Sequence, residues 1–342
     1  MQKKMMEVNT KNPIECCFGA AQLRIPEMLE GYFTGSKMAV ISDREVFGYY
    51  GEDFVNQFKR KDIPVSVIIV DGNQSAKSVD AVKQVYEGLI DASFHEKDMI
   101  VAFGGGGILD ISGFAAKTFF GGAPLVQVPT SLLAMVDSVE SPYAYLNFQS
   151  YKDRLQVKSD PIYTMIDTQY LRTLPSRYYA NGIAEIIRYG LLTAPELLPL
   201  LSAEKIEMDT LIEKSIQAKI TLLQPKNDSI RDFGREIGAA IEGHFRFLKY
   251  SHGEALALSM LSMFPSSDLR ELYDRFNLPQ KIEGVTKDTL LKRLTKDVLV
   301  TKDPVKYGMV KEPGKPFVQE SSVEEASEQF NDFLSSICLV GG

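Results

Sequence analysis

Cysteine is scarce in this chain, and the few copies present do not form a disulfide framework. Among 342 residues only Cys16, Cys17 and Cys338 are cysteines, and the adjacent pair cannot make an ordinary structural bridge. We therefore expect a reducing compartment, the cytoplasm. Long apolar runs are also missing: no segment reaches the roughly 18 residues of a membrane span, so no membrane partner is expected.

Positive charge is the second shortage. The chain has 38 Lys and Arg against 45 Asp and Glu, a net charge of −7. A nucleic-acid-binding surface usually needs an excess of basic residues, so we expect no nucleic-acid partner. With 44% hydrophobic and 24% charged residues the composition is that of a globular protein, and the length allows two domains.

Short β-branched apolar runs at 38–42, 65–70, 99–103 and 125–128 alternate with helical patterns such as Val79–Ile90. Alternation of this kind predicts a Rossmann-like α/β N-terminal domain over residues 1–168. Helical periodicity then dominates, which predicts an all-α C-terminal domain over 169–342, with Lys302–Pro316 as a loop. We expect the active site between the halves, at the carboxyl ends of the strands.

The segment DMIVAFGGGGILDISGFAAK, residues 98–117, is a strand, four glycines and a helix. Glycines at such a junction let a phosphate approach backbone N–H groups, and the helix N-terminus favours the anion. A merely structural tight turn is the alternative. Asp110 stands where the usual dinucleotide fingerprint has its third glycine.

Several motifs in order give the chain a resemblance to the dehydroquinate synthase family of sugar-phosphate cyclases. The glycines are followed by Gln127–Ser138 (QVPTSLLAMVDS), then by residues 166–192 (IDTQYLRTLPSRYYANGIAEIIRYGLL), by SIQAK at 215–219 and by HGEALAL at 252–258. The resemblance implies the dehydroquinate synthase-like fold, a cytoplasmic homodimer, and NAD used as a recycled oxidant. It also implies a lyase that eliminates phosphate and closes a ring.

The resemblance places the cofactor against a set of residues distributed over the first half of the chain. By family position these are Asp43, Lys77, Gly104, Gly105, Gly106, Gly107, Asp110, Thr130, Ser131, Lys152 and Thr173. Lys77 is displaced by one residue from the family's lysine, and the acidic residue of that motif is replaced by Asn73.

The family's metal site, usually for zinc, is altered. Glu185 and His252 match two of its ligands, but the third position is Arg235 and the family's catalytic histidine is Ala239. A guanidinium is always cationic and has no lone pair to donate, so Arg235 cannot be a ligand, and a divalent metal is doubtful.

The other two histidines are not expected to repair this site. We interpret His95 as a surface residue. If Phe233, Ile237, Ile241, Phe245 and Leu248 form one apolar helical stripe, His244 lies near that stripe and away from Arg235. We interpret it as a core or interface histidine, with a replacement ligand as the alternative.

His252 has a defined position of its own. Ser251 and Glu254 match a capping box, which places His252 in the first turn of a helix, suited to be a ligand or a base; the alternative is a residue inherited without a role.

The expected catalytic residues are Asp137, Lys152, Arg188, Lys219, Arg235 and His252. Glu185 and Arg188, three residues apart, share a helix face and could pair. Arg235 would supply the charge of the metal, Lys152 and Lys219 would orient a small anionic sugar phosphate or polyol, and His252 or a water would move protons.

Some anion contacts of the family are replaced, at Ser141–Ala144 and Gly121-Gly122, so we expect an activity other than true 3-dehydroquinate synthesis. Two alternatives stay open: an NAD-dependent polyol dehydrogenase or partial-reaction lyase, and a catalytically silent homologue that binds nucleotide or a partner.

Overall fold

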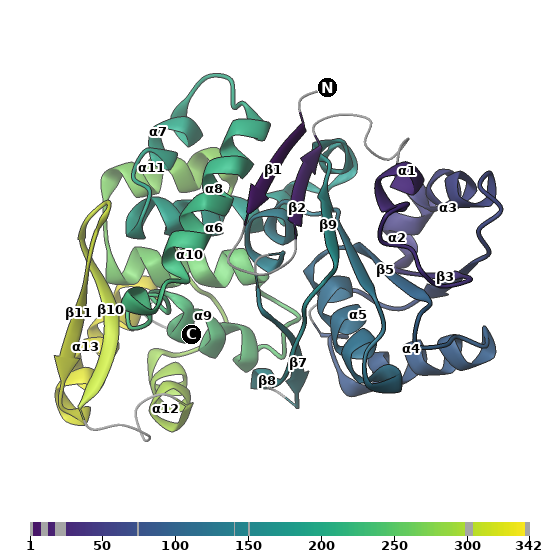
Figure 1. Ribbon diagram of the computed structural model, residues 1–342. Helices are drawn as coiled ribbons and strands as arrows, with labels where there is room; N and C mark the ends of the chain where they lie inside the picture. The colour runs from purple at the N-terminus through teal and green to yellow at the C-terminus, as the bar shows by residue number, and fades with distance from the viewer. Residues whose placement is uncertain are drawn as a thin grey trace. The chain divides into compact units, whose positions relative to one another are not determined.

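The chain packs as two units, Met1–Pro175 and Ser176–Gly342. The structure is a computed structural model that describes residues 3–7, 13–17, 25–73, 75–139, 141–149, 151–297 and 304–338. Each unit is built around its own core (Figure 1).

A seven-stranded sheet forms the centre of the first unit, with the order β1-β2-β9-β6-β5-β3-β4. All neighbours pair in parallel except β1 and β2. Every residue of β3, β5 and β6 is buried, as expected for parallel strands covered on both faces. The strands are β1 (Lys3–Glu7), β2 (Pro13–Cys17), β3 (Met38–Ser42), β4 (Val65–Ile69), β5 (Met99–Gly104), β6 (Leu125–Pro129) and β9 (Tyr163–Ile166).

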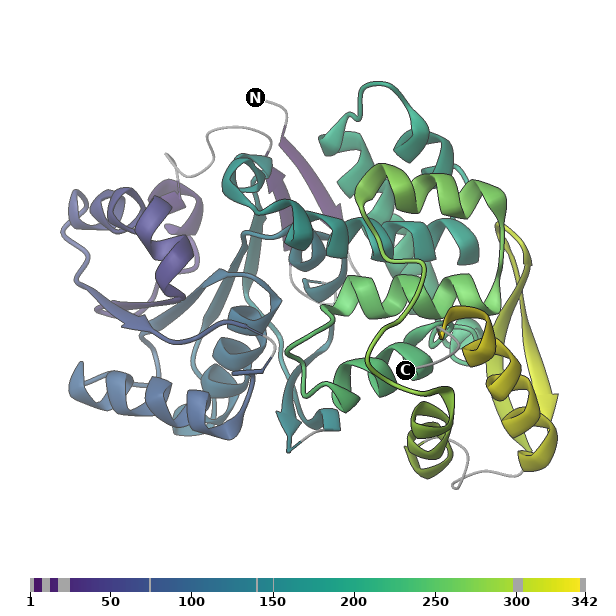
Figure 2. The same ribbon diagram turned by 180° about the vertical axis from the view of Figure 1, so that it is seen from behind.

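Five of these strands define a doubly wound topology. Read across the sheet as β4, β3, β5, β6 and β9, they stand in the chain order second, first, third, fourth and fifth, so the winding reverses between β3 and β5. Figure 2 shows the helices of residues 25–59 in purple on one side of the strands and α4 and α5 in blue on the other. The helical elements are α1 (Ile25–Leu29), α2 (Arg44–Val46), η2 (Phe47–Gly51), α3 (Glu52–Lys59), α4 (Val79–Asp91), α5 (Gly106–Thr118), η3 (Phe119–Gly121), η4 (Ala134–Ser138) and η5 (Thr168–Thr173).

A separate antiparallel hairpin, β7 (Tyr143–Phe148) with β8 (Tyr151–Lys158), follows the glycine-loop helix and packs on α5. The sequence interpretation did not include it. β8 alternates half-buried and exposed residues from Asp153 onward, and β7 buries Ala144, Leu146 and Asn147, as expected for a hairpin with one covered face.

The second unit is mostly helical, as predicted. Its central helix is α10, which packs against α6, α9, α11 and α13 and buries almost every side chain. The helices are α6 (Ser176–Leu192), α7 (Leu197–Ser202), α8 (Met208–Leu222), η6 (Pro225–Asn227), α9 (Arg235–His244), α10 (His252–Met263), α11 (Ser267–Phe276), α12 (Lys287–Asp297) and α13 (Val323–Ile337).

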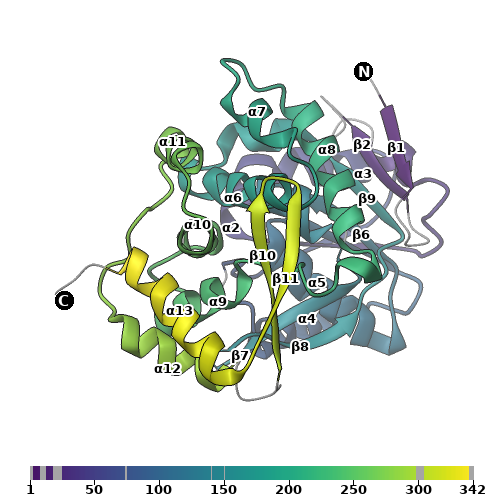
Figure 3. The same cartoon turned by 90° about the vertical axis from the view of Figure 1, so that its left-hand side faces the viewer.

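The predicted loop Lys302–Pro316 is wrong over its described part. Residues Val305–Glu312 form β10, and Lys315–Ser321 form β11, in an antiparallel hairpin that precedes α13 and is drawn in yellow in Figure 3. Pro313 and Gly314 are the two turn residues, and Gly314 has φ +78°, the left-handed conformation that glycine adopts easily. The C-terminal unit therefore contains a small β-hairpin beside its helices.

A transmembrane helix was not expected. None of the helices within the described ranges has the length and apolar character needed to cross a bilayer.

Candidate active site

The glycine loop lies at the carboxyl edge of the sheet, where the winding reverses. β5 ends at Gly104, and α5 begins at Gly106 after Gly105, an N-cap that supplies no side-chain hydrogen bond. The first N–H groups of a helix have no partner within the helix, so they are available to a bound anion. β3, the other strand at the reversal, ends at Ser42 immediately before Asp43.

The glycines of this loop are required by close packing as well as by access. A Cβ on Gly107 would lie 2.1 Å from the carbonyl oxygen of Gly72, and one on Gly106 would lie 2.9 Å from the hydroxyl of Ser138. A Cβ on Gly105 would meet nothing closer than 3.5 Å. A side chain at Gly105 would therefore make ordinary contacts with Ser131, and the position adjoins the first turn of α5, which fits a cofactor diphosphate.

Four predicted cofactor residues surround this edge. The Thr130 N–H donates to the Gly104 carbonyl (2.9 Å), and Ser131 Oγ is the atom nearest to a Cβ built on Gly105. Asp43 caps α2 by accepting from the Val46 N–H at 2.9 Å. Thr173 hydrogen-bonds through its hydroxyl to Tyr50, in the segment that follows α2 (2.8 Å).

Lys77 and Asp110, two further predicted cofactor residues, form an ion pair with each other. The buried Lys77 ammonium donates to Asp110 Oδ2 at 2.9 Å and to Asp153 Oδ1 at 2.5 Å. Burial by itself would lower the pKa of Lys77, but the two carboxylates raise it above its ordinary value. Asp110 also accepts from the Tyr145 N–H at 3.0 Å. This ionic cluster therefore fastens the β7–β8 hairpin to α5.

Asp137 and Lys152 complete the predicted residues of the first unit. Asp137 is half-buried in η4, the π-helical turn after β6. Lys152 is half-buried on β8, beside Asp153. Their assigned roles remain predictions.

In the second unit, the close approach of α10 to α6 builds a polar cluster. A Cβ on Gly253 would lie 2.3 Å from Asn181 Cα, so only glycine allows this contact. Asn181 Oδ1 accepts from the Ser251 hydroxyl at 2.7 Å and from the Gly253 N–H at 3.2 Å. The predicted capping box of Ser251 and Glu254 is confirmed, and with Asn181 it fixes the first turn of α10, where His252 lies.

Glu185 is the centre of this cluster. Its carboxylate is fully buried and accepts from Arg188 Nε at 2.7 Å, which confirms the predicted pairing, and from Arg235 Nη2 at 2.9 Å; His252 Nε2 is 3.2 Å away. Burial alone would raise the pKa of Glu185, but the two arginine charges and the His252 contact hold it well below its ordinary range. Glu185 is therefore a carboxylate shared by two guanidinium groups.

His252 bridges two carboxylates. Its Nε2 faces Glu185 and its Nδ1 lies 3.1 Å from Glu242 Oε1. Each ring nitrogen of His252 therefore faces a carboxylate oxygen, and both can take part in a hydrogen bond. Glu242 belongs to the Ile-Glu pair that the sequence shares with the family, which was the only signal for its place here.

A divalent metal does not fit the described residues at this cluster. The three side chains at the family's ligand positions do come together, but one is Arg235, and its guanidinium takes the Oε1 atom of Glu185. Over the described ranges no group of three or more His, Cys, Asp or Glu side chains is placed to hold an ion. The donor set at the family's ligand positions therefore consists of Glu185 and His252.

Lys219, from the predicted catalytic set, and Glu236 are buried or partly buried. Lys219 is almost fully buried in the last turn of α8. Glu236, which follows Arg235, was not singled out from the sequence. Its burial, with a smaller contribution from Asp232, raises its pKa to about 8.

The expected helical stripe from Phe233 to Leu248 is wrong at both ends. Gly234 has φ +81°, so α9 begins only at Arg235, and the helix ends at His244; Leu248 is exposed. His244 is half-buried and contacts the Phe245 ring edge-on. Burial and the charge of Arg293 lower its pKa.

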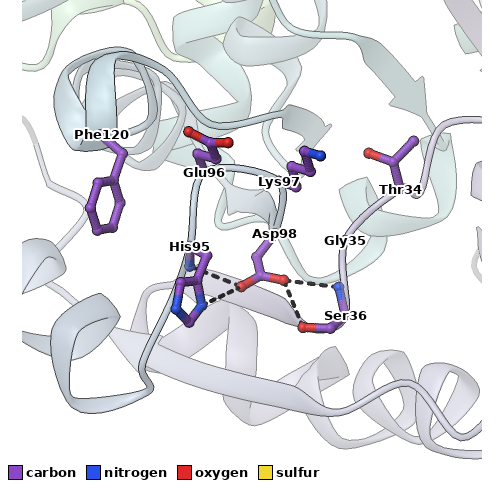
Figure 4. A pocket seen from close by; sticks show the side chains of 8 residues that line it. All are labelled: Thr34, Gly35, Ser36, His95, Glu96, Lys97, Asp98 and Phe120. Carbon is purple, nitrogen blue, oxygen red and sulfur yellow. Dashed lines mark hydrogen bonds and ion pairs between the residues drawn. The ribbon is translucent and has the colours of Figure 1, made fainter.

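A surface pocket of about 570 Å³ lies beside the amino ends of β3 and β5, at the opposite ends of these strands from the glycine loop (Figure 4). Asp98 accepts from Ser36 and Lys37 through Oδ1 and from the His95 N–H through Oδ2, so it joins two loops. The His95 ring is exposed, as predicted.

Comparison with known proteins defines the class. A sequence model for the 3-dehydroquinate synthase N-terminal domain matches residues 66–181, and one for its C-terminal domain matches residues 182–298. The chain belongs to the 3-dehydroquinate synthase family, as the motifs predicted.

Individual relatives agree with this assignment. The chain is 34% identical over 249 residues to 3-dehydroquinate synthase of Rippkaea orientalis, covering 68% of each chain. Its fold is similar to 2-epi-5-epi-valiolone synthase of Streptomyces hygroscopicus, solved with NAD⁺ and Zn²⁺ (22% identity, 98% and 99% coverage, TM-score 0.82). It is also similar to 2-deoxy-scyllo-inosose synthase in complex with carbaglucose-6-phosphate, NAD⁺ and Co²⁺ (23% identity, 97% and 100% coverage, TM-score 0.80).

Proposed function

We propose that this chain is an NAD-dependent enzyme of the sugar-phosphate-cyclase type that acts on a substrate other than that of 3-dehydroquinate synthase. The observation that carries the proposal is the glycine loop at the reversal of the sheet, where Gly105, which has no side chain, is the N-cap of α5. Family membership supports the reaction type, because NAD⁺ is present in both of the cyclase-like structures described above.

The first unit would bind the cofactor. The first-turn N–H groups of α5 would hold the diphosphate, and Asp43, Thr130, Ser131 and Thr173 would surround the rest of it. Bound NAD would accept a hydride from one substrate alcohol carbon and return it after phosphate has left.

The second unit would supply the charges. Arg235 is the guanidinium of the Glu185 cluster that reaches the surface of this unit, with 30% of its side chain exposed, whereas Arg188 has none exposed. It would donate to an anionic substrate oxygen, and Lys219 of the same unit would orient the substrate. Lys152, on β8 of the first unit, keeps its predicted role in orienting the substrate. His252, held between Glu185 and Glu242, would give or take a proton.

The substrate is expected to differ from that of the family's synthases because the surrounding residues differ. Ala239 on α9 has no titratable group, although the family pattern has a histidine there. Ala239 replaces a proton-transfer histidine, and Arg235 would replace the charge of the metal. Both changes alter which substrate oxygens can be polarised, and therefore which substrate reacts.

Cofactor binding can be tested directly. We expect NAD⁺ to raise the melting temperature of the purified full-length chain, because a ligand that binds only the folded state stabilises it. Gly105→Ala should weaken NAD⁺ binding by about tenfold or more, because its methyl group would stand at the entrance to the first turn of α5. Gly31→Ala, where a Cβ meets no atom within 4 Å, is the matched control and should bind normally.

The reaction type needs a second measurement. The chain, with NAD⁺ present, is incubated with hexose and heptulose phosphates while inorganic phosphate and NADH are followed together. Phosphate release without accumulation of NADH is the expected result, because the hydride is returned. NADH without phosphate would instead indicate a plain dehydrogenase, and NAD⁺ binding without either product would favour a silent homologue.

A further inference from the structure

Oε1 of Glu185 has both Arg235 and His252 as neighbours. Arg235 Nη2 is 2.9 Å away and His252 Nε2 is 3.2 Å away, and these three residues stand at the positions of the metal ligands in the family pattern. Oε1, the Glu185 oxygen that faces His252, therefore already accepts a hydrogen bond from a charged group. Arg235 stands at a ligand position of the family but cannot itself bind a metal.

Charge also disfavours an ion at this point. Arg188 and Arg235 both contact the same carboxylate, at 2.7 and 2.9 Å, and neither guanidinium can lose its proton in a protein. A divalent cation bound to Glu185 would lie beside two fixed positive charges, in a buried site where repulsion is screened weakly. Displacing Arg235 would relieve one of them but would leave only two protein ligands.

The other residues that hold His252 in place are present. Asn181 and Gly253 hold the start of α10 against α6, and Glu242 contacts His252 Nδ1. A carboxylate on the second nitrogen of a histidine is the usual outer-shell partner of a metal ligand, because it orients the ring. One substitution, at Arg235, therefore separates this cluster from a set of three ligands.

We propose that the Glu185–Arg235 ion pair permanently replaces the divalent ion in this chain, so that the cluster binds no metal and Arg235→His restores a metal site. The proposal concerns the cluster alone. It is tested by metal content, independently of NAD binding and of turnover.

The test uses tag-free, full-length protein that has been treated with a chelator, equilibrated with equimolar Zn²⁺, desalted and analysed by mass spectrometry for zinc. The wild type should retain less than about 0.1 zinc per chain and R235H about one, because three ligands and an open position suffice for a zinc site. Arg231→His is the matched control. Arg231 pairs with Asp228 and is more exposed, so a histidine there should bind no zinc beyond the wild-type amount.

Two more variants decide the remaining outcomes. R235H/H252N should lose the zinc that R235H gains, which assigns the ion to this cluster. Arg235→Gln removes the guanidinium without adding a ligand and should stay free of zinc. A wild type that retains one zinc per chain would overturn the proposal, and so would a folded R235H that binds none. If R235H does not fold, zinc-free wild type and R235Q support the proposal, and zinc in either overturns it.

Discussion

Removal of the Glu185 charge is the sharpest test of the buried cluster. In Glu185→Gln the shape is kept, but Arg188, whose side chain has no exposed surface, loses its carboxylate at 2.7 Å. Its remaining described acceptor is the Arg231 carbonyl, at 2.7 Å from Nη1, and Nη2 already lacks a partner among the described residues. Arg235 is 30% exposed and can be solvated, so the main cost comes from Arg188.

Glu185→Gln should lower the free energy of unfolding by about 3–5 kcal/mol, the range for removing one partner of a buried ion pair. It is measured from urea unfolding followed by circular dichroism, comparing midpoints at unchanged slope. The matched control is Arg177→Gln. Arg177 pairs with Glu254 at 2.7 Å, but half of its side chain is exposed, so this change should cost no more than about 1 kcal/mol.

A double variant separates charge from packing. If the loss in E185Q comes from an uncompensated charge, E185Q/R188M should recover much of it, because the orphaned guanidinium is gone. Equal losses in E185Q and R177Q, or a double variant less stable than E185Q, would refute the assignment of a buried ionic centre.

Two other predictions concern neighbouring features. Burial raises the pKa of Glu236 to about 8 from its ordinary 4.5, so the folded state holds a proton that the unfolded state has lost, and its contribution to stability falls as pH rises between those values. The slope is at most about 1.4 kcal/mol per pH unit, and urea midpoints from about pH 5 to pH 8 should decline less in Glu236→Gln; parallel declines would contradict this. Gly107→Ala, whose Cβ would lie 2.1 Å from a carbonyl oxygen, should lose about 1–3 kcal/mol by urea unfolding. Gly105→Ala, whose Cβ would lie 3.5 Å from its nearest neighbour, should lower the free energy of unfolding by less than about 0.5 kcal/mol. A similar loss in both variants would refute the packing argument.

The strands of the first sheet could be predicted from the sequence because they are buried on both faces. The apolar runs at 38–42 and 99–103 agree with β3 and β5 to within one residue. The pairing of Glu185 with Arg188 could also be predicted, since a spacing of three residues on one helix fixes it.

The two hairpins could not be predicted with the same rule. β8 and β11 carry charged and polar residues, so they show no apolar run, and the short, mostly apolar segment of β7 was not recognised as a strand. At Pro313-Gly314 the turn residues were interpreted as part of a loop, although Pro-Gly at the centre of a two-residue turn is also a hairpin signal. The length of α9 was missed because the sequence alone does not show that Gly234 has a positive φ.

The partner of Arg235 was the decisive missing contact. Sequence comparison shows that an arginine stands at a ligand position, but 50 residues separate it from Glu185, and only the packing of α6, α9 and α10 brings them to 2.9 Å. Because Arg188 and Arg235 hold the two oxygens of one buried carboxylate, the arginine is an integral part of this core and not merely a filler. A chain that had simply lost a metal would be expected to leave Glu185 and Glu242 in mutual repulsion around His252. Here two guanidinium groups neutralise the charge of Glu185, and the His252 ring stands between Glu185 and Glu242, which is the arrangement expected if the cluster functions as a permanent ion pair.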